Sequence, residues 1–238
     1  MALQLVTAAE TSSGYRIAAR SKDAGEMYLY DVIGAGWMGG IGAKQVSDDL
    51  KKLGNITTLD VRINSDGGDV FEGRTIYTML AEHKARVVVH VDGLAASIAS
   101  LIAMAGNEIR MADGSFMMLH NPWGIEAGEA SDHRKMADLL DTVAGTLRQT
   151  YAARSGKKED DVRKWMDAET WFTAKEAKDS GLADIVAAPV KAAAAVRDII
   201  RAADHRKIEA HTRFKNLPAA LRPRRAAMAE KFAALRGR

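Results

Sequence analysis

Residues 59–69 read LDVRINSDGGD, a run of alternating apolar residues that ends in two adjacent glycines. A helical pattern follows, and the same order of strand, turn and helix recurs along the N-terminal half of the chain. This alternation is typical of βαβ crossovers in a mostly parallel sheet, so the sequence predicts an α/β fold. The predicted strands are Met27–Ile33, Leu59–Asn64, Arg86–Val91, Glu108–Met111 and Phe116–His120, and the predicted helices among them are Ala43–Leu53, Glu72–Lys84 and Ala95–Ala105.

The second half of the chain has a different pattern. Apolar side chains recur at spacings of three and four over Ser131–Ala153, which predicts one long amphipathic helix. Shorter helices are predicted at Lys158–Met166 and Ala174–Ser180, and Ala187-Ala188-Pro189 marks a boundary. We therefore expect a domain over 1–188 and a basic, Ala- and Arg-rich helical extension over 189–238, which holds 13 Lys and Arg against 4 Asp and Glu.

The amino-acid composition limits which side chains can take part in catalysis. The chain has 238 residues, of which 47% are hydrophobic and 27% charged, as in an ordinary globular protein. It has no cysteine, which excludes disulfide scaffolds, thiolate zinc sites and cysteine nucleophiles. No apolar run reaches the roughly 18 residues of a membrane span, and the start lacks a signal-peptide pattern. We expect a cytoplasmic protein without a membrane partner, whose chemistry depends on serine, histidine and carboxylates.

The glycine pair is the first of three segments that follow predicted strands, where parallel α/β folds place their sites. Gly67 and Gly68 permit backbone geometry in which N–H groups face an anionic oxygen. The alternative is a tight turn before a helix. Asp66 and Asp69 alone are a poor metal site, so no metal or other cofactor is expected.

A serine and a histidine follow the other two strands. Ser97 lies among small residues near a predicted helix start, where it is either a nucleophile or a helix cap. His120 ends an apolar strand, and it is either a base for that serine or a hydrogen-bonded core residue. The other five histidines show no spacing typical of a metal site.

In order along the chain, these motifs resemble the Clp protease proteolytic subunit, the ClpP family of serine peptidases. The similar segments cover roughly residues 25–186. They are Asn64-Ser65-Asp66-Gly67-Gly68, Gly93-Leu94-Ala95-Ala96-Ser97, Met118-Leu119-His120-Asn121-Pro122, and Glu169 to Ala177 running on to Gly181-Leu182-Ala183-Asp184. The resemblance implies a ClpP/crotonase-like fold of repeated ββα-type units with a long protruding handle helix.

The resemblance also implies roles for single residues. Ser97 would be the nucleophile and His120 the general base and acid, with the N–H groups of Gly68 and Ile98 as the oxyanion hole. The third triad position is Glu169, where the family usually has Asp, and the rival is Asp167. Asp66 stands where the family commonly has Pro.

Within the family, three short segments are most similar to the ClpP-related head maturation proteases of tailed phages. They are residues 28–34, Asp69-Val70-Phe71 and His120-Asn121-Pro122-Trp123. This likeness implies cleavage of unfolded or capsid scaffold proteins, in the host cytoplasm or the prohead. The alternatives are a proteolytic subunit that works with a Clp ATPase, an acyl-CoA enzyme that stabilises an enolate, and an assembly protein without activity.

The same resemblance implies which molecules the protein binds. Family members form heptameric rings stacked as a double ring, so we expect a homo-oligomeric ring that cleaves protein or peptide substrates. The basic extension is either a solvated helix or a contact for an acidic partner such as a scaffold protein. It holds two aromatic residues, Phe214 and Phe232, so no nucleic-acid partner is expected.

Overall fold

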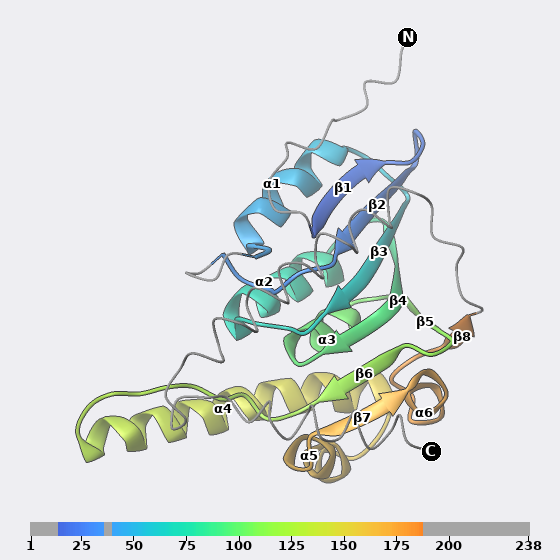
Figure 1. The fold of residues 1–238 in the computed structure, drawn as a ribbon. Helices are drawn as coiled ribbons and strands as arrows, with labels where there is room; N and C mark the ends of the chain where they lie inside the picture. The colour runs from blue at the N-terminus through green and yellow to red at the C-terminus, as the bar shows by residue number, and fades with distance from the viewer. Residues whose placement is uncertain (1–13, 36–39, 188–238) are drawn as a thin grey trace.

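A computed structural model of the chain describes residues 14–35 and 40–187. Within these ranges an eight-stranded sheet carries helices against it, and Figure 1 shows their arrangement. The predicted α/β class is confirmed. The main sheet has the order β1-β2-β3-β4-β5-β8, with β1 antiparallel to β2 and the later neighbours parallel. These strands are β1 (Tyr15–Ala19), β2 (Ala24–Leu29), β3 (Thr58–Ser65), β4 (Arg86–Ala96), β5 (Glu108–Ala112) and β8 (Ile185–Ala187).

The sheet divides at β4, the longest of these strands. The first half of β4 pairs with β5 over Val88–Val91, whereas Leu94–Ala96 pair with β6 (Phe116–Leu119). β6 then pairs antiparallel with β7 (Thr170–Thr173). The end of β4 therefore leaves the main sheet and lies beside β6, so the residues that follow these two strands become neighbours.

Three helices cover one face of the main sheet: α1 (Ala43–Leu53), α2 (Val70–Ala81) and α3 (Ile98–Ala103). α2 begins directly after the glycine pair because the Asp69 side chain accepts hydrogen bonds from the N–H groups of Phe71 and Glu72. On β3, alternate side chains point into the core that these helices close, in the period of two expected for a strand. The fully buried residues of this core include Leu59, Val61, Ile63, Ile76, Leu101 and Ile102.

A charged cluster on the opposite face joins β3 to β4. Arg62 Nε donates to Asp92 Oδ2 at 2.9 Å, its Nη2 pairs with the other oxygen of Asp92, and the Tyr30 hydroxyl donates to Asp92 as well. Burial and the Asp92 carboxylate raise the pKa of Tyr30. Because all three groups are paired, the cluster holds β4 in register just before Gly93.

The long helix α4 (Ala130–Ser155) extends well past the sheet in Figure 1, as the resemblance predicts for a handle. A capping box formed by Glu129 and Asp132 begins it. Leu147 and Tyr151, near its C-terminal end, are its buried residues. Leu139, in its first half, is 47% exposed. α5 (Glu159–Asp167) and α6 (Ala174–Asp179) follow on either side of β7.

Several predicted boundaries were wrong. The strand predicted at Met27–Ile33 is β2 at Ala24–Leu29, and β1, β7 and β8 were not predicted at all. The helix predicted from Ala95 begins at Ile98, because Ala95 and Ala96 pair with Met117 and Met118 of β6, and this pairing outweighs the helix preference of alanine. The predicted extension 189–238 lies outside the described residues, so the domain boundary stays a prediction.

Candidate active site

Ser97 occupies a sharp turn between β4 and α3. Its backbone has φ 55° and ψ −129°, a conformation that non-glycine residues rarely adopt and that costs about 1–3 kcal/mol. Two main-chain bonds hold the turn: the Ser97 N–H donates to the Met118 carbonyl at 3.0 Å, and the Ser97 carbonyl accepts from the Ser100 N–H at 3.0 Å. A strained strand-to-helix turn of this kind presents a serine hydroxyl at the edge of a sheet.

His120 meets this serine because of the register between β4 and β6. Ala96 pairs with Met118, so the residues just beyond the two strand ends lie next to each other. His120 Nε2 lies 2.7 Å from Ser97 Oγ, within hydrogen-bond distance, and both side chains are half-buried. The structure therefore brings together the serine and histidine that lie 23 residues apart in the sequence.

Glu169 and Asp167, the two candidates for the acid, differ in their surroundings. Leu119 pairs with Thr170 across β6 and β7, so the residue before Thr170 lies close to His120. Burial lowers the pKa of His120, and the nearby Glu169 carboxylate raises it in part. Asp167 accepts a hydrogen bond from Asn121 Nδ2 at 2.8 Å, and Glu169 accepts one from Trp171 Nε1 at 3.4 Å. Neither carboxylate is hydrogen-bonded to His120 within the described residues, but only Glu169 acts on its charge.

Gly67 and Gly68 pack tightly against the turn. A Cβ at Gly67, which has φ 93°, would lie 2.7 Å from the Ala96 carbonyl oxygen and 2.7 Å from Ser97 Cβ. A Cβ at Gly68, which has φ 152°, would lie 2.0 Å from the Ile33 carbonyl oxygen. Both contacts are too close for any side chain, so the end of β3 reaches Ser97 only with glycine at these positions.

The predicted oxyanion donors are the N–H groups of Gly68 and Ile98. Ile33 bonds to the residues on either side of Gly68, donating to the Gly67 carbonyl and accepting from the Asp69 N–H, both at 2.8 Å. Gly68's own N–H points the other way in such a parallel bridge. Ile98 begins α3, so its N–H has no partner within the helix. Neither group donates to an acceptor in the described part of the chain.

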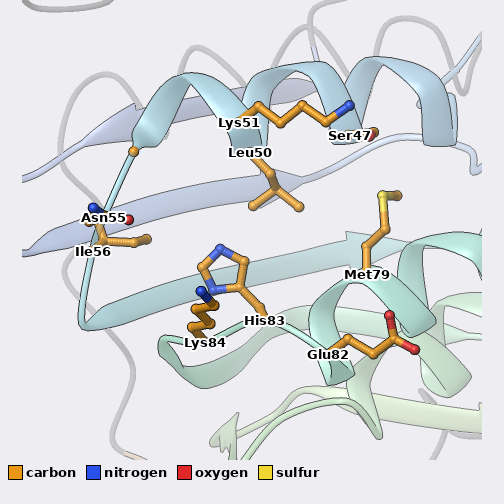
Figure 2. A pocket seen from close by; sticks show the side chains of 10 residues that line it. Ser47, Leu50, Lys51, Asn55, Ile56, Met79, Glu82, His83 and Lys84 are labelled. Atoms are coloured by element: carbon orange, nitrogen blue, oxygen red, sulfur yellow. The ribbon is translucent and has the colours of Figure 1, made fainter.

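A hollow of about 520 Å³ lies elsewhere, between the C-terminal ends of α1 and α2 (Figure 2). Leu50, Ile56 and Met79 line it, and Lys51, Glu82 and Lys84 are charged residues around it. It adjoins the residues that precede β3 and β4, whereas the glycine pair and Ser97 follow these strands. The hollow is therefore separate from the serine and histidine.

Residues 14–35 and 40–187 contain no group of three or more His, Asp or Glu side chains arranged to hold a metal ion. Over the same ranges, no helix combines the length and the apolar character needed to cross a membrane.

The family model for Clp protease matches residues 42–190, more than half of the chain. The chain belongs to the Clp protease family. It is 30% identical over 139 residues to the ATP-dependent Clp protease proteolytic subunit 1 of Salinibacter ruber, covering 58% of this chain and 60% of that protein. It is 34% identical over 130 residues to the ATP-dependent Clp protease proteolytic subunit of Bacteroides fragilis, covering 54% of this chain and 63% of that protein.

A third relative, the ATP-dependent Clp protease proteolytic subunit of Pleurastrum terricola, is 34% identical over 131 residues, covering 54% of this chain and 66% of that protein. The chain thus spans less than two thirds of the length of each of these relatives. Residues 42–190, which the family model matches, contain the sequence motifs, and the resemblance to the ClpP family is confirmed.

Sequence reasoning did not predict that Ser100 and Tyr151 contact the Ser97 turn. Ser100 Oγ donates to the Ser97 carbonyl at 2.6 Å, and Tyr151 of α4 lies 2.8 Å from that hydroxyl. The apolar stripe of the long helix includes Tyr151, but spacing alone does not indicate where its hydroxyl bonds. Ser65 was also missed: its buried Oγ accepts from the Gly67 N–H at 3.1 Å and donates to the Asp31 carbonyl at 2.6 Å, which shapes the glycine loop.

Measuring the pKa of His120 in two variants tests which carboxylate acts on the imidazole. Removing the negative charge in Glu169→Gln should lower the pKa of His120 further, because the carboxylate favours the imidazolium and burial opposes it. Asp167→Asn is the matched control and should leave the His120 titration where it is in the wild type. The measurement is an NMR titration of the imidazole carbons; a shift in the Asp167 variant alone would contradict the assignment.

Proposed function

We propose that this protein is a serine-type endopeptidase in which Ser97 is the nucleophile and His120 the general base. The observation that carries the proposal is the 2.7 Å approach of His120 Nε2 to Ser97 Oγ at a strained turn. A serine hydroxyl becomes a nucleophile when an imidazole within hydrogen-bond distance takes its proton. Family membership supports the same chemistry, since the similar proteins are named as proteolytic subunits.

The reaction divides into two steps. In the first, Ser97 Oγ bonds to the peptide carbonyl carbon as its proton moves to His120 Nε2. The negative oxygen that results is held by the N–H groups of Gly68 and Ile98. His120 then gives the proton to the leaving amine, the C–N bond breaks, and an acyl-enzyme remains. In the second step a water molecule, deprotonated by His120, hydrolyses the acyl-enzyme and restores the Ser97 hydroxyl.

The lowered pKa of His120 suits this role. A pKa below the ordinary value leaves the imidazole neutral near pH 7, so that it can accept the serine proton. The imidazolium that forms is then stabilised by a nearby carboxylate. We assign that role to Glu169 rather than to Asp167, because the charge of Glu169 acts on the pKa of His120. With Nε2 facing Ser97, Nδ1 is the nitrogen left for the acid.

The alternative functions explain fewer features of the site. An acyl-CoA enzyme that stabilises an enolate would use the two N–H groups but would leave the paired Ser97 and His120 without a role. An assembly protein without activity would not need the strained Ser97 backbone, which persists only where the surrounding structure holds it. The serine and histidine therefore favour hydrolysis.

The substrate we propose is a flexible or unfolded polypeptide. Two exposed aromatic residues flank the site in the sequence: Phe71, which follows the glycine loop and is 63% exposed, and Trp123, which follows His120 and is 61% exposed. Aromatic residues are enriched where a protein surface binds another polypeptide.

Two biological settings fit such a substrate. The segments at residues 28–34, Asp69–Phe71 and His120–Trp123 favour maturation of a phage head, with a capsid or scaffold protein as substrate and no ATPase. The relatives, named as subunits of ATP-dependent Clp proteases, favour work beside a Clp ATPase. We propose head maturation and keep the Clp setting as the alternative.

We also propose that the chain assembles into a ring through α4. In addition to Leu139, the preceding segment exposes Ile125, which is 68% accessible to solvent. The exposed Leu139 and Ile125 are the apolar side chains that we expect another subunit to cover. A heptameric ring or a double ring is the assembly implied by the ClpP family.

Removing the nucleophile should abolish cleavage. Ser97→Ala is expected to reduce kcat for a short fluorogenic peptide by about 10⁴-fold or more, because no other hydroxyl is within reach of His120 Nε2 in the described chain. Ser47→Ala, on α1, is the control and should keep wild-type activity. Residual cleavage by the Ser97 variant above the level of uncatalysed hydrolysis would contradict its role.

The role of an ATPase can be tested with casein, a flexible protein substrate. In head maturation, the purified chain should cleave casein without ATP and without a partner, and the Ser97→Ala variant should not. Cleavage of short peptides alone, with casein degraded only after a Clp ATPase and ATP are added, would contradict head maturation and support the alternative.

Assembly can be measured by sedimentation velocity. The wild type should sediment as an oligomer of at least seven subunits, and Leu139→Glu should shift it toward smaller species because a charge replaces an apolar contact. Asp138→Asn, at the neighbouring exposed position, should sediment as the wild type does. A wild-type chain that sediments only as a monomer would contradict the ring.

A further inference from the structure

Two buried hydroxyl groups connect the long helix to the Ser97 turn. Ser100 Oγ donates to the Ser97 carbonyl at 2.6 Å and lies 2.8 Å from the Tyr151 hydroxyl. Because the single hydroxyl proton of Ser100 goes to the carbonyl, the Tyr151 hydroxyl is the donor in the second bond. Tyr151 also lies 3.5 Å from the Ser97 carbonyl. Ser100 is 0% and Tyr151 2% exposed, so water does not compete for these bonds.

The direction of the Ser97 carbonyl affects the proposed oxyanion hole because this carbonyl shares a peptide group with the Ile98 N–H. A peptide group is planar and trans, so its carbonyl and its N–H point in opposite directions and rotate together. Whatever fixes the direction of the Ser97 carbonyl therefore fixes the direction of the Ile98 N–H. The strained dihedral angles of Ser97 would relax by rotating this same group.

We propose that Ser100 and Tyr151 are positioning residues that aim the Ile98 N–H at the oxyanion. This inference rests on the proposed function, in which that N–H stabilises the negative oxygen. Ser100 acts directly on the Ser97 carbonyl, and Tyr151 acts through Ser100 by orienting its hydroxyl. A residue of α4, 51 positions beyond Ser100, thereby contributes to the geometry of the site.

The expected signature is a loss in kcat with little change in KM. The Ile98 N–H meets full negative charge only in the transition state, so misaligning it weakens transition-state binding and leaves the binding of ground-state substrate intact. Ser100→Ala should lower kcat for a short fluorogenic peptide by about tenfold, and Tyr151→Phe by about threefold, with KM within about twofold of the wild type.

The double variant and two controls separate positioning from packing. If Tyr151 acts through Ser100, the double variant Ser100→Ala/Tyr151→Phe should lose no more than Ser100→Ala alone. Tyr28→Phe removes the hydroxyl of another buried tyrosine, on β2, and Thr142→Ala removes a hydroxyl bond to the Asp138 carbonyl elsewhere on α4. Both controls should keep kcat, even where they lower the melting temperature.

Unchanged kcat in folded Ser100→Ala, beside an active wild type, would overturn the inference while leaving the proposed function intact. An inactive wild type would instead overturn the proposed function. In that case, amide hydrogen exchange over residues 94–104 tests whether the Ser100 and Tyr151 hydroxyl groups hold the Ser97 turn. Faster exchange of the Ser100 N–H in both variants than in the controls would support the hydroxyl connection. Equal exchange rates would overturn it.

Discussion

The site depends on the absence of a side chain at Gly67. The end of β3 approaches the turn after β4 so closely that a Cβ at this position would lie 2.7 Å from the Ala96 carbonyl oxygen. Any larger residue would separate the two strand ends, and with them the N–H groups of Gly68 and Ile98 that together form the proposed oxyanion hole. Ser65 supports the same geometry by bonding to the Gly67 N–H and to the Asp31 carbonyl. The donors belong to the main chain, so their positions depend on how the strands end rather than on which side chains line the site.

Two opposing effects set the pKa of His120. Burial lowers the pKa of the imidazole, and the Glu169 carboxylate partly restores it. The first effect leaves the ring neutral and able to accept a proton, and the second stabilises the charged ring that forms when it does. Glu169 itself has φ 50°, so non-glycine backbone strain occurs at two of the proposed site residues, Ser97 and Glu169. Such strain often gathers where function fixes the backbone.

The sequence predicted three strands that lead to the site residues, because glycine pairs, small residues and an apolar strand leave clear local signals. It ended the second of them at Val91, whereas β4 continues to Ala96. It also predicted the class of fold and the long helix, which the structure extends by one residue at its start and two at its end. Local signals did not indicate β7 and β8, which are four and three residues long and exist through pairing with β6 and β5. The same limit applies to the contact between Ser100 and Tyr151, because a bond across 51 residues is set by tertiary packing. The preference for Glu169 over Asp167 came from the resemblance, and the register of β6 against β7 adds a structural reason for it.

The most direct measurement is the intact mass of the folded chain after exposure to a serine-reactive fluorophosphonate, with the adduct mapped by peptide sequencing. One adduct per chain is expected, on Ser97, because this is the only serine of the described residues with an imidazole 2.7 Å from its hydroxyl. The same exposure of His120→Ala should give no adduct, since the serine then keeps its proton. A folded wild-type chain that forms no adduct, or an adduct on Ser97 that persists without His120, would contradict the claim that these two residues form a working nucleophile and base.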